Sequence, residues 1–220
     1  QGVRYAVISP GSRNAPLIMA FSRFGKIKCH SVIDERSAGF MALGMSINDH
    51  IPAVVICTSG SALANLYPSV LEAYYMQVPM IVISADRPSS MIDKWDGQTI
   101  HQQNFFSKHI KASFVTPENP SSELEMIQIS NMAFYESLSS VRGPVHINVP
   151  LHEPLYAAVK ETFEYPTLSL QSHQNSDTEY LPEKLQEDVI GNSRVLLLFG
   201  ANFHKSNIDY LKKHQNCVVL

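Results

Sequence analysis

Four short polar segments carry the residues in this chain that can do chemistry. Each directly follows an apolar run: Ser9-Pro10-Gly11-Ser12-Arg13, Asp34-Glu35-Arg36, Thr58-Ser59-Gly60-Ser61 and Asp86-Arg87-Pro88. They supply carboxylates that can exchange protons, guanidinium groups that can bind carboxylates, and glycine turns whose backbone N–H groups can face an anion. The same residue types are common in ordinary turns and helix caps. Their position alone therefore favours a functional and a structural interpretation equally.

Glu35 is the sharpest single candidate, because it stands where an apolar segment meets a helical pattern. A carboxylate in such a place can be partly desolvated and its protonation tuned for acid–base chemistry. The alternative is that Glu35 merely complements the positive end of the helix that follows. The residue pattern alone favours this second interpretation.

Arginines stand in three of the four segments, at positions 13, 36 and 87. On one rim they would suit a small polyanionic acid, since a guanidinium binds a carboxylate through two parallel hydrogen bonds. Alternatively, each pairs with a neighbouring acidic residue: Asp34, Glu35 or Asp86. The Thr58–Ser61 segment is only a weak anion cradle, because it lacks a GxGxxG fingerprint and a Walker lysine. We expect Trp95, Tyr74 and Tyr75 to pack, and His146 to be a hydrogen-bonded core residue.

Apolar runs alternate with helical patterns and so indicate the elements that position these segments. Strands are predicted at 5–8, 31–33, 53–57, 80–83, 112–115 and 145–149. Helical spacing follows 17–24, 40–47, 63–74 and 124–138, with a break expected at Pro68 and a capping box formed by Ser122 and Glu125. Residues 89–110 are polar and predict a long loop with one helix.

Strands that are apolar at every position are typical of a parallel sheet covered by helices on both faces. We therefore predict an α/β fold with a doubly wound, mostly parallel sheet. Ligands bind beyond the carboxyl ends of the strands in such a sheet, which is where the four polar segments fall.

The domain boundaries follow from composition. Residues 1–157 are predicted to form the first domain, the polar stretch 158–192 a linker, and 193–220 the truncated start of a second, central α/β domain. The chain begins without Met, almost inside a strand, and ends inside another. We expect it to be a piece of a longer protein.

The overall composition narrows the function classes. The 220 residues include 17 Lys+Arg and 20 Asp+Glu, a net charge of −3, and no basic stripe of the kind a nucleic-acid binder needs. No apolar run approaches a membrane span, and no signal peptide is evident. Three widely spaced cysteines fit free thiols in a reducing compartment, and the histidines and cysteines form no metal-ligand spacing. We expect a soluble, cytoplasmic protein with a small-molecule partner and no metal site of its own.

Taken together, several segments resemble the thiamine-diphosphate enzyme superfamily and, within it, the carboligating synthases of menaquinone biosynthesis. The matching stretches run in family order over the whole first domain: Ser9–Arg13, Asp34–Arg36 with Gly39–Gly44, Thr58–Gly60 through Asn65–Pro68, Ala85–Pro88, and His146–Asn148 through Glu153–Tyr156. No single stretch is specific, but the ordered set is.

The resemblance implies a decarboxylating transferase that joins the unit left from 2-oxoglutarate to isochorismate. It implies that residues 1–157 bind the aminopyrimidine of thiamine diphosphate. Glu35 matches the catalytic glutamate that hydrogen-bonds a pyrimidine nitrogen, and Gly11, Gly60 and Asn65 match cofactor-binding positions. The positions that contact substrate carboxylates and hydroxyls correspond to Ser12, Arg13, Arg87 and Gln98.

The family holds the diphosphate and Mg²⁺, or Mn²⁺, through a Gly-Asp-Gly motif followed by an Asn, and no Gly-Asp-Gly occurs in these 220 residues. The resemblance therefore implies that metal and diphosphate are bound mainly by a domain absent from this chain. It also implies a homodimer or tetramer with a shared site, and a fragment that is inactive alone. A 2-oxoacid decarboxylase or acetolactate-synthase-like enzyme, and a non-catalytic domain, stay open as alternatives.

Overall fold

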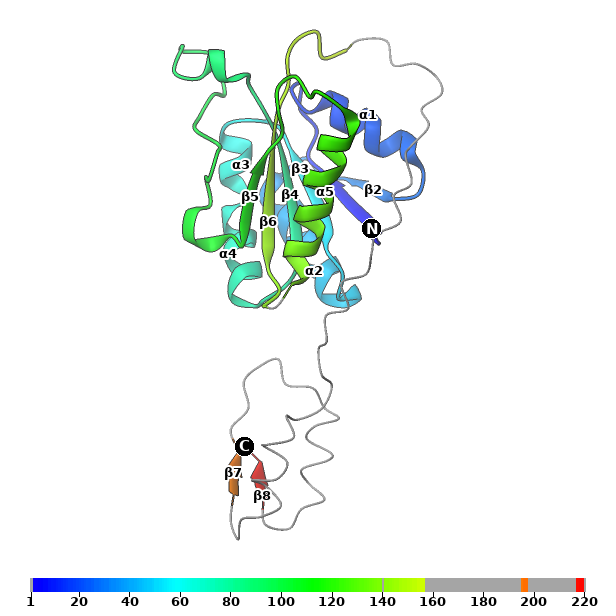
Figure 1. Ribbon diagram of the computed structural model, residues 1–220, viewed down its shortest axis with the longest axis vertical. Helices are drawn as coiled ribbons and strands as arrows, with labels where there is room; N and C mark the ends of the chain where they lie inside the picture. The colour runs from blue at the N-terminus through cyan, green and yellow to red at the C-terminus, as the bar shows by residue number, and fades with distance from the viewer. Residues whose placement is uncertain (1, 140, 157–194, 198–216, 220) are drawn as a thin grey trace. The chain divides into compact units, whose positions relative to one another are not determined.

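Six parallel strands form the central sheet, in the order β2-β1-β3-β4-β6-β5 (Figure 1). The computed structural model describes residues 2–139, 141–156, 195–197 and 217–219. The strands of this sheet are β1 (Tyr5–Ile8), β2 (Lys28–Ser31), β3 (Ala53–Cys57), β4 (Met80–Asp86), β5 (Ala112–Val115) and β6 (Pro144–Pro150). The helices are α1 (Ala15–Phe24), α2 (Glu35–Asp49), α3 (Ser61–Asn65), α4 (Tyr67–Tyr75) and α5 (Glu123–Leu138), with 3₁₀ turns η1 (Ser89–Met91) and η2 (Ser107–His109).

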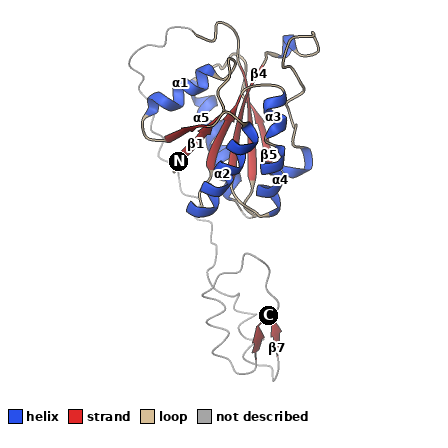
Figure 2. Ribbon diagram, turned by 180° about the vertical axis from the view of Figure 1, so that it is seen from behind, coloured by secondary structure: helices blue, strands red, loops and turns tan. Residues whose placement is uncertain are grey.

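Two hydrophobic layers sandwich the sheet, because successive strand residues face opposite sides. Val7, Val55 and Val82 pack with α2, α3 and α4 on one face. Ile8 and Ile56 pack with α1 and α5 on the other. Figure 2 shows the helices on the two sides of the sheet. The predicted doubly wound α/β fold is confirmed.

The burial of each strand depends on its place in the sheet. The central strands β3 and β4 are buried at every residue, whereas the edge strands β2 and β5 are only partly covered. The second strand was predicted at 31–33 but lies at Lys28–Ser31, and Ile33 is 85% exposed. The prediction followed the apolar residues, but an edge strand with a polar face carries no continuous apolar run.

The chain breaks at the proline that the sequence singled out. α3 ends at Asn65, and α4 begins at Tyr67 with Pro68 in its first turn, where the missing N–H costs no helical hydrogen bond. The predicted capping box at α5 is wrong in its residue: the N-cap is Ser122, but Glu125 accepts hydrogen bonds from the backbone N and Oγ of Ser121. The side chain of Ser122 makes no capping hydrogen bond, so the reciprocal pair of a capping box does not form.

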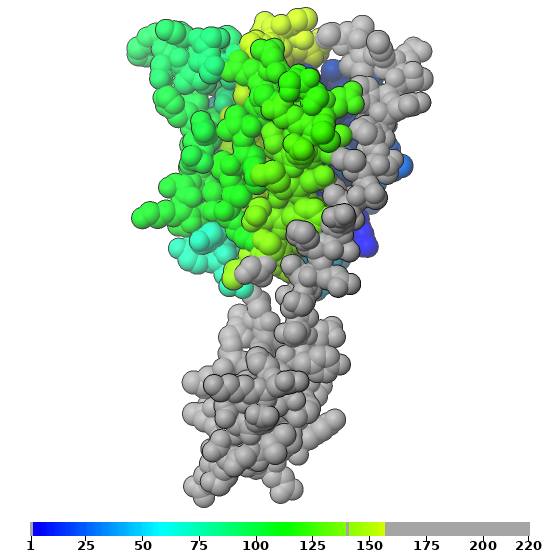
Figure 3. Space-filling model, in the orientation of Figure 1, coloured from blue at the N-terminus to red at the C-terminus, as the bar shows by residue number. Residues whose placement is uncertain are grey.

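The segment between β4 and β5 is a long loop with η1 and η2 rather than one helix. Its teal-green part, which begins with η1, projects beyond the carboxyl end of the sheet in Figure 1. In the space-filling view of Figure 3 the same colour forms an outlying part of the surface. Trp95 lies in this loop and is fully exposed, with φ of 59°, so the prediction that it packs is wrong. Tyr74 and Tyr75 do form ring contacts with His109, although Tyr75 is largely exposed.

The chain divides into two compact units, Gln1–Leu170 and Gln171–Leu220. In the second unit the described residues form two parallel strands, β7 (Val195–Leu197) and β8 (Cys217–Val219). The predicted linker 158–192 lies outside the described residues. Among the described residues, no helix is both long and apolar enough to cross a membrane.

Candidate functional site

The four polar segments all lie at the carboxyl edge of the sheet. β1, β2, β3 and β4 run parallel, and each is followed within a few residues by one of these segments. Residues after the carboxyl ends of parallel strands meet at one edge. The topology therefore brings together side chains that are far apart in the sequence.

Glu35 is the first residue of α2, but it is not the residue that caps the helix. Asp34 is the N-cap, and its carboxylate accepts a hydrogen bond from the backbone N of Ser37 at 2.7 Å. The half-buried Glu35 carboxylate instead accepts a hydrogen bond from Nδ2 of Asn65 at 3.1 Å, across from the end of α3. No lysine or arginine in the described part of the chain forms an ion pair with it.

Glu35 also lies close enough to β3 to affect a thiol electrostatically. Burial, with a smaller contribution from the Glu35 charge, raises the pKa of the Cys57 thiol. Cys57 is the last residue of β3 and is completely buried. A negative charge therefore sits at the end of an apolar strand, as the sequence pattern suggested, with Asn65 as its hydrogen-bond partner.

Two glycines allow backbone segments to approach closely at this edge. Gly60 has φ of +75°, and a Cβ there would lie 2.7 Å from the carbonyl oxygen of Gln98. A Cβ on Gly11 would lie 2.7 Å from Cβ of Thr58. Both backbone N–H groups are already used: Gly60 donates to Oε1 of Gln102 and Gly11 donates to Oδ1 of Asn14, each at 2.8 Å. Neither N–H is free for an anion.

A buried polar network supports the edge from below. Ser84 on β4 and Asn148 on β6 are register partners, and Oγ of Ser84 donates to Oδ1 of Asn148 at 2.8 Å. Nε2 of Gln102, from the long loop, donates to the same Oδ1 at 2.8 Å and to the carbonyl of Ala85 at 3.1 Å. Nδ2 of Asn148 donates to Oδ2 of Asp86 at 2.7 Å. This network joins the loop to both strands and, through Gln102, to Gly60.

His146 ends the network as a neutral core residue, as predicted. Its Nε2 lies 2.7 Å from Oγ of Ser84, whose proton is directed at Asn148, so Nε2 carries the hydrogen. Nδ1 is buried without a partner in the structure. Burial lowers the pKa of His146 to about 3, and the imidazole is therefore uncharged at neutral pH.

Asp86 is also buried, and its pKa is shifted in the opposite direction from that of His146. Burial raises the pKa of its carboxyl, against the hydrogen bonds from Asn148 and the backbone of Arg87 and against the charges of Arg87 and Arg13. Its exposed fraction is 5%. Both its oxygens accept hydrogen bonds, so this carboxylate is fixed in place.

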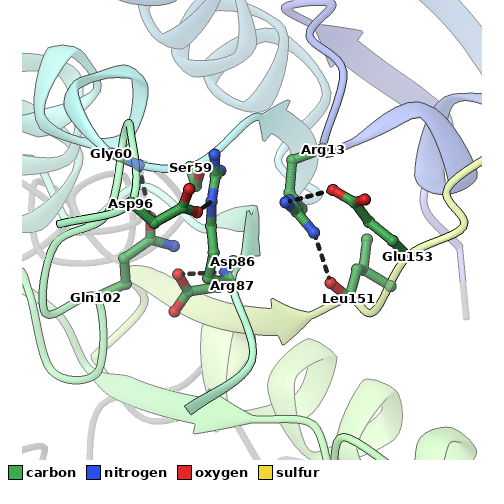
Figure 4. Close-up of polar contacts among 9 residues, drawn as sticks. All are labelled: Arg13, Ser59, Gly60, Asp86, Arg87, Asp96, Gln102, Leu151 and Glu153. Carbon is green, nitrogen blue, oxygen red and sulfur yellow. Dashed lines mark hydrogen bonds and ion pairs between the residues drawn. The ribbon is translucent and has the colours of Figure 1, made fainter. Parts of the chain in front are cut away.

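Figure 4 shows Arg87 directly beside Asp86, and Arg13 at the same edge of the sheet. Arg13 donates to the carbonyl of Leu151 at 2.9 Å and to Oε1 of Glu153 at 3.2 Å. Arg87 donates from Nε to Oδ2 of Asp96 at 2.7 Å, and from Nη1 to Oγ of Ser59. The alternative that the arginines pair with Asp34, Glu35 or Asp86 is wrong for these two. Arg13 pairs with Glu153, which is 140 residues away in the sequence, and Arg87 pairs with Asp96, nine residues further along the same loop.

The remaining predicted residues are on the surface. Ser12 and Gln98 are exposed at the same edge, Ser12 in the turn before α1 and Gln98 against Gly60. Arg36 is exposed too, and its charge contributes to lowering the pKa of Asp34 rather than joining the other arginines. Among the described residues, no group of three or more His, Cys, Asp or Glu side chains is arranged to hold a metal ion.

Residues 1–111, half of the chain, match the family described as thiamine pyrophosphate enzyme, N-terminal TPP binding domain. This chain belongs to that family. The match contains Glu35, Gly60, Asn65 and both edge arginines, and it ends just before β5.

Several curated relatives of this thiamine pyrophosphate enzyme domain share one name. The chain is 51% identical over 191 residues to 2-succinyl-5-enolpyruvyl-6-hydroxy-3-cyclohexene-1-carboxylate synthase of Desulfotalea psychrophila, covering 86% of the chain and 35% of the relative. It is 46% identical over 226 residues to the protein of that name from Flavobacterium psychrophilum, covering 100% of the chain and 40% of the relative. The chain thus spans only about two fifths or less of the length of these relatives.

Among solved structures, benzoylformate decarboxylase from Polynucleobacter necessarius aligns with a TM-score of 0.66 at 20% identity, over 90% of this chain and 36% of that one. At this identity the likeness concerns the fold alone. It places the doubly wound sheet of this thiamine pyrophosphate enzyme domain among known architectures.

The sequence did not indicate that Arg87, Gly60 and Arg13 would contact Asp96, Gln102 and Glu153, respectively. Glu153 and Asp96 lie in irregular segments, and nothing in their spacing indicated a partner. A signal for the network did exist: polar residues recur at alternate positions in two otherwise apolar strands, at Ser84 and Asp86 and at His146 and Asn148. Alternate strand residues share a face, so this pattern could have indicated that the four side chains meet, although we did not predict it.

Proposed function

We propose that this chain supplies the pyrimidine-binding half-site of a 2-succinyl-5-enolpyruvyl-6-hydroxy-3-cyclohexene-1-carboxylate synthase. The whole enzyme would be a thiamine-diphosphate-dependent transferase of menaquinone biosynthesis that joins the decarboxylated unit of 2-oxoglutarate to isochorismate. The relatives' shared name supports this reading. The observation that carries it is the Glu35 carboxylate, which points at Asn65 and pairs with no cation in the described part of the chain.

The residues at the edge fit the pyrimidine end of this cofactor. An aminopyrimidine needs a carboxyl group beside a ring nitrogen. Glu35 offers one that is half-buried and, within the described part of the chain, accepts one hydrogen bond, from Asn65. The turn at Gly60 brings the backbone of residue 98 within van der Waals contact, so the site has a close-packed wall. Gly11 and Asn65 complete the proposed cofactor-binding set at the same edge.

Thiamine diphosphate, when bound, supplies the electron sink for decarboxylation and carbon–carbon bond formation. The protein's part is orientation and proton transfer. Glu35 would share a proton between its carboxyl oxygen and the pyrimidine nitrogen. A partly buried carboxyl can form such a shared hydrogen bond, whereas in bulk water solvent molecules would compete for the proton. Asn65 would keep the carboxylate oriented by donating to the other side of the same group.

The substrate's carboxylates would bind Arg13 and Arg87, with Ser12 and Gln98 donating to its carboxylates and hydroxyls. The two guanidinium groups already bind protein carboxylates at this edge, so their surroundings suit that charge. Residues 1–157 would form the pyrimidine-binding domain, 158–192 a linker, and 193–220 the start of the central domain. Mg²⁺ or Mn²⁺ and the diphosphate would be held mainly by a domain outside this chain, in a cytoplasmic homodimer or tetramer.

The test uses the full-length protein that contains this chain. Incubation with thiamine diphosphate, Mg²⁺, 2-oxoglutarate and isochorismate should release carbon dioxide and give the joined product by mass spectrometry, and calorimetry should detect the cofactor. Product from pyruvate alone would instead favour an acetolactate-type enzyme or a simple decarboxylase. Absence of cofactor binding would favour a non-catalytic domain. The isolated 220-residue chain should show no turnover.

A further inference from the structure

The arginines at the carboxyl edge already hold carboxylates of the protein itself. Arg87 donates from Nε to Oδ2 of Asp96 at 2.7 Å, and Arg13 donates to Oε1 of Glu153 at 3.2 Å. Both guanidinium groups are largely buried, with exposed fractions of 12% and 6% for the arginine side chains. A buried cation requires an anionic partner, so some carboxylate must occupy this position whether or not a ligand is bound.

The carboxylates around the arginines differ in how firmly they are held. Asp86 is 5% exposed and accepts hydrogen bonds from Asn148 and from the backbone N of Arg87. Asp96 is 35% exposed, and Arg87 is its side chain's hydrogen-bond and ion-pair partner in the structure. Arg87, with a smaller contribution from Arg13, lowers the pKa of Asp96, which keeps it anionic. Asp86 is a fixed part of the edge, whereas Asp96 can be exchanged for another carboxylate.

Asp96 belongs to a short segment with anchors at its two sides and strain within it. Before it, the backbone N of Ser89 donates to Oε1 of Glu118; after it, Gln102 is buried in the network of β4 and β6. Between these anchors, Asp93, Trp95 and Gln98 have positive φ, a region that side chains other than glycine adopt at a cost. Losing the contact between Asp96 and Arg87 would therefore remove the ion pair that ties this part of the segment to the edge, while both anchors and the packing of Gln98 against Gly60 stay.

We propose that Asp96 pairs with the Arg87 guanidinium in place of a substrate carboxylate, and that a dicarboxylate ligand binds by displacing Asp96 from Arg87. Asp96 is in this sense a specificity-determining residue. A ligand binds Arg87 only if its carboxylate pairs with the guanidinium more strongly than the intramolecular carboxylate of Asp96 does, so weakly pairing anions are excluded. The proposal rests on the proposed role of Arg87 in binding substrate carboxylates. Trp95, the only tryptophan of this chain and fully exposed, moves with Asp96 and reports the exchange.

The experiment titrates the full-length enzyme with succinate, a dicarboxylate without a reactive keto group, at constant ionic strength. The signal is tryptophan emission, assigned to residue 95 as the part lost in Trp95→Phe. Succinate should change this emission in the wild type and not in Arg87→Ala. Asp96→Asn should bind succinate about two- to fivefold more tightly, the size expected when one solvent-accessible ion pair no longer competes. Asp96→Glu, which keeps the charge, should stay within about twofold of the wild type.

Asp93→Asn is the matched control, since it removes one negative charge from the same segment. Asp93 is 74% exposed and pairs with His101 rather than with an arginine. It should leave succinate affinity unchanged. In turnover assays, Asp96→Asn should lower the KM for isochorismate by a similar factor while kcat stays within about twofold.

Two results would overturn the proposal: weaker succinate binding in Asp96→Asn, or a large fall in kcat, since either means that Asp96 holds Arg87 in its working position. Equal tightening in Asp93→Asn would also overturn it, because the effect would then be one of net charge. The succinate titration needs no turnover. The titration therefore still tests whether Asp96 competes for Arg87 even if the protein lacks the proposed synthase activity.

Discussion

Two carboxylates at the same edge of the sheet, Glu35 and Asp86, are held in opposite ways. Asp86 is 5% exposed, and each of its oxygens accepts a hydrogen bond, from Asn148 and from the backbone of Arg87. Glu35 is half-buried and accepts one hydrogen bond, from the side chain of Asn65 on another helix. Both oxygens of the first carboxylate are engaged by the protein, whereas one oxygen of the second accepts no hydrogen bond from the described residues and is available to a ligand.

The difference follows from the position of each residue in the fold. Asp86 is the last residue of the central strand β4, so a neighbouring strand stands beside it and supplies Asn148. Glu35 begins α2 after an edge strand, and the helix end is already capped by Asp34. A carboxylate that is released from capping, and that accepts no hydrogen bond from a strand residue in the described part of the chain, can be directed at a ligand. Burial at the sheet's centre instead makes a carboxylate structural.

The largest effect is expected from replacing the ligand-directed carboxylate. Glu35→Gln in the full-length enzyme should lower kcat by about 10²- to 10⁴-fold, the range for losing a general acid–base group. The amide keeps the side chain's size, so the unfolding midpoint should change little. Steady-state turnover and thermal unfolding measure the two effects.

Glu72→Gln is the matched control for that variant, because Glu72 is an exposed helical glutamate on α4. It should keep full activity. Near-normal turnover in Glu35→Gln would contradict the proposed role and would place Glu35 in the same structural class as Asp86.

Asp86→Asn should show the reverse of what we expect for Glu35→Gln: a clear loss of folding stability, and no direct loss of a proton-transfer group. The new amide would bring an NH₂ group against Nδ2 of Asn148, and turning Asn148 over would break its bonds to Ser84 and Gln102. Leaving one buried group unsatisfied costs about 1–3 kcal/mol. Urea unfolding should give a fall of that size.

A charge-swapped double variant sharpens this test. With Asp86→Asn and Asn148→Asp together, the residue at 148 accepts from Ser84, Gln102 and the new amide, and every hydrogen bond of the pair can form again. We expect it to recover part of the lost stability. If Asp86→Asn were as stable as the wild type, the network would not hold this edge as described.

The sequence predicted the layered sheet well, because fully apolar strands such as β3 and β4 have few alternatives. It missed the position of β2, whose partly covered residues give no such pattern. At the site, Glu35 and the two arginines were found from their place after strands. Their contacts with Asn65, Glu153 and Asp96 were not predicted, because tertiary contacts between loops leave no periodic trace in the sequence.

The smallest effect concerns the neutral end of the buried network. Burial lowers the pKa of His146 from 6.5 to about 3, so below pH 6.5 the unfolded chain takes up a proton that the folded chain does not. Stability should therefore be constant above the unfolded pKa and fall with pH below it, by about 1.4 kcal/mol between pH 7.5 and 5.5. His146→Gln, which keeps a donor for Ser84 but does not titrate, should lack this loss in urea unfolding. Asp86, whose pKa is raised, contributes with the opposite sign at lower pH, so the difference between the two proteins isolates the histidine. If the wild type and His146→Gln showed the same pH dependence of stability, His146 would not be buried as a neutral ring. The buried network around Asp86 would then be as accessible to solvent as the surroundings of Glu35.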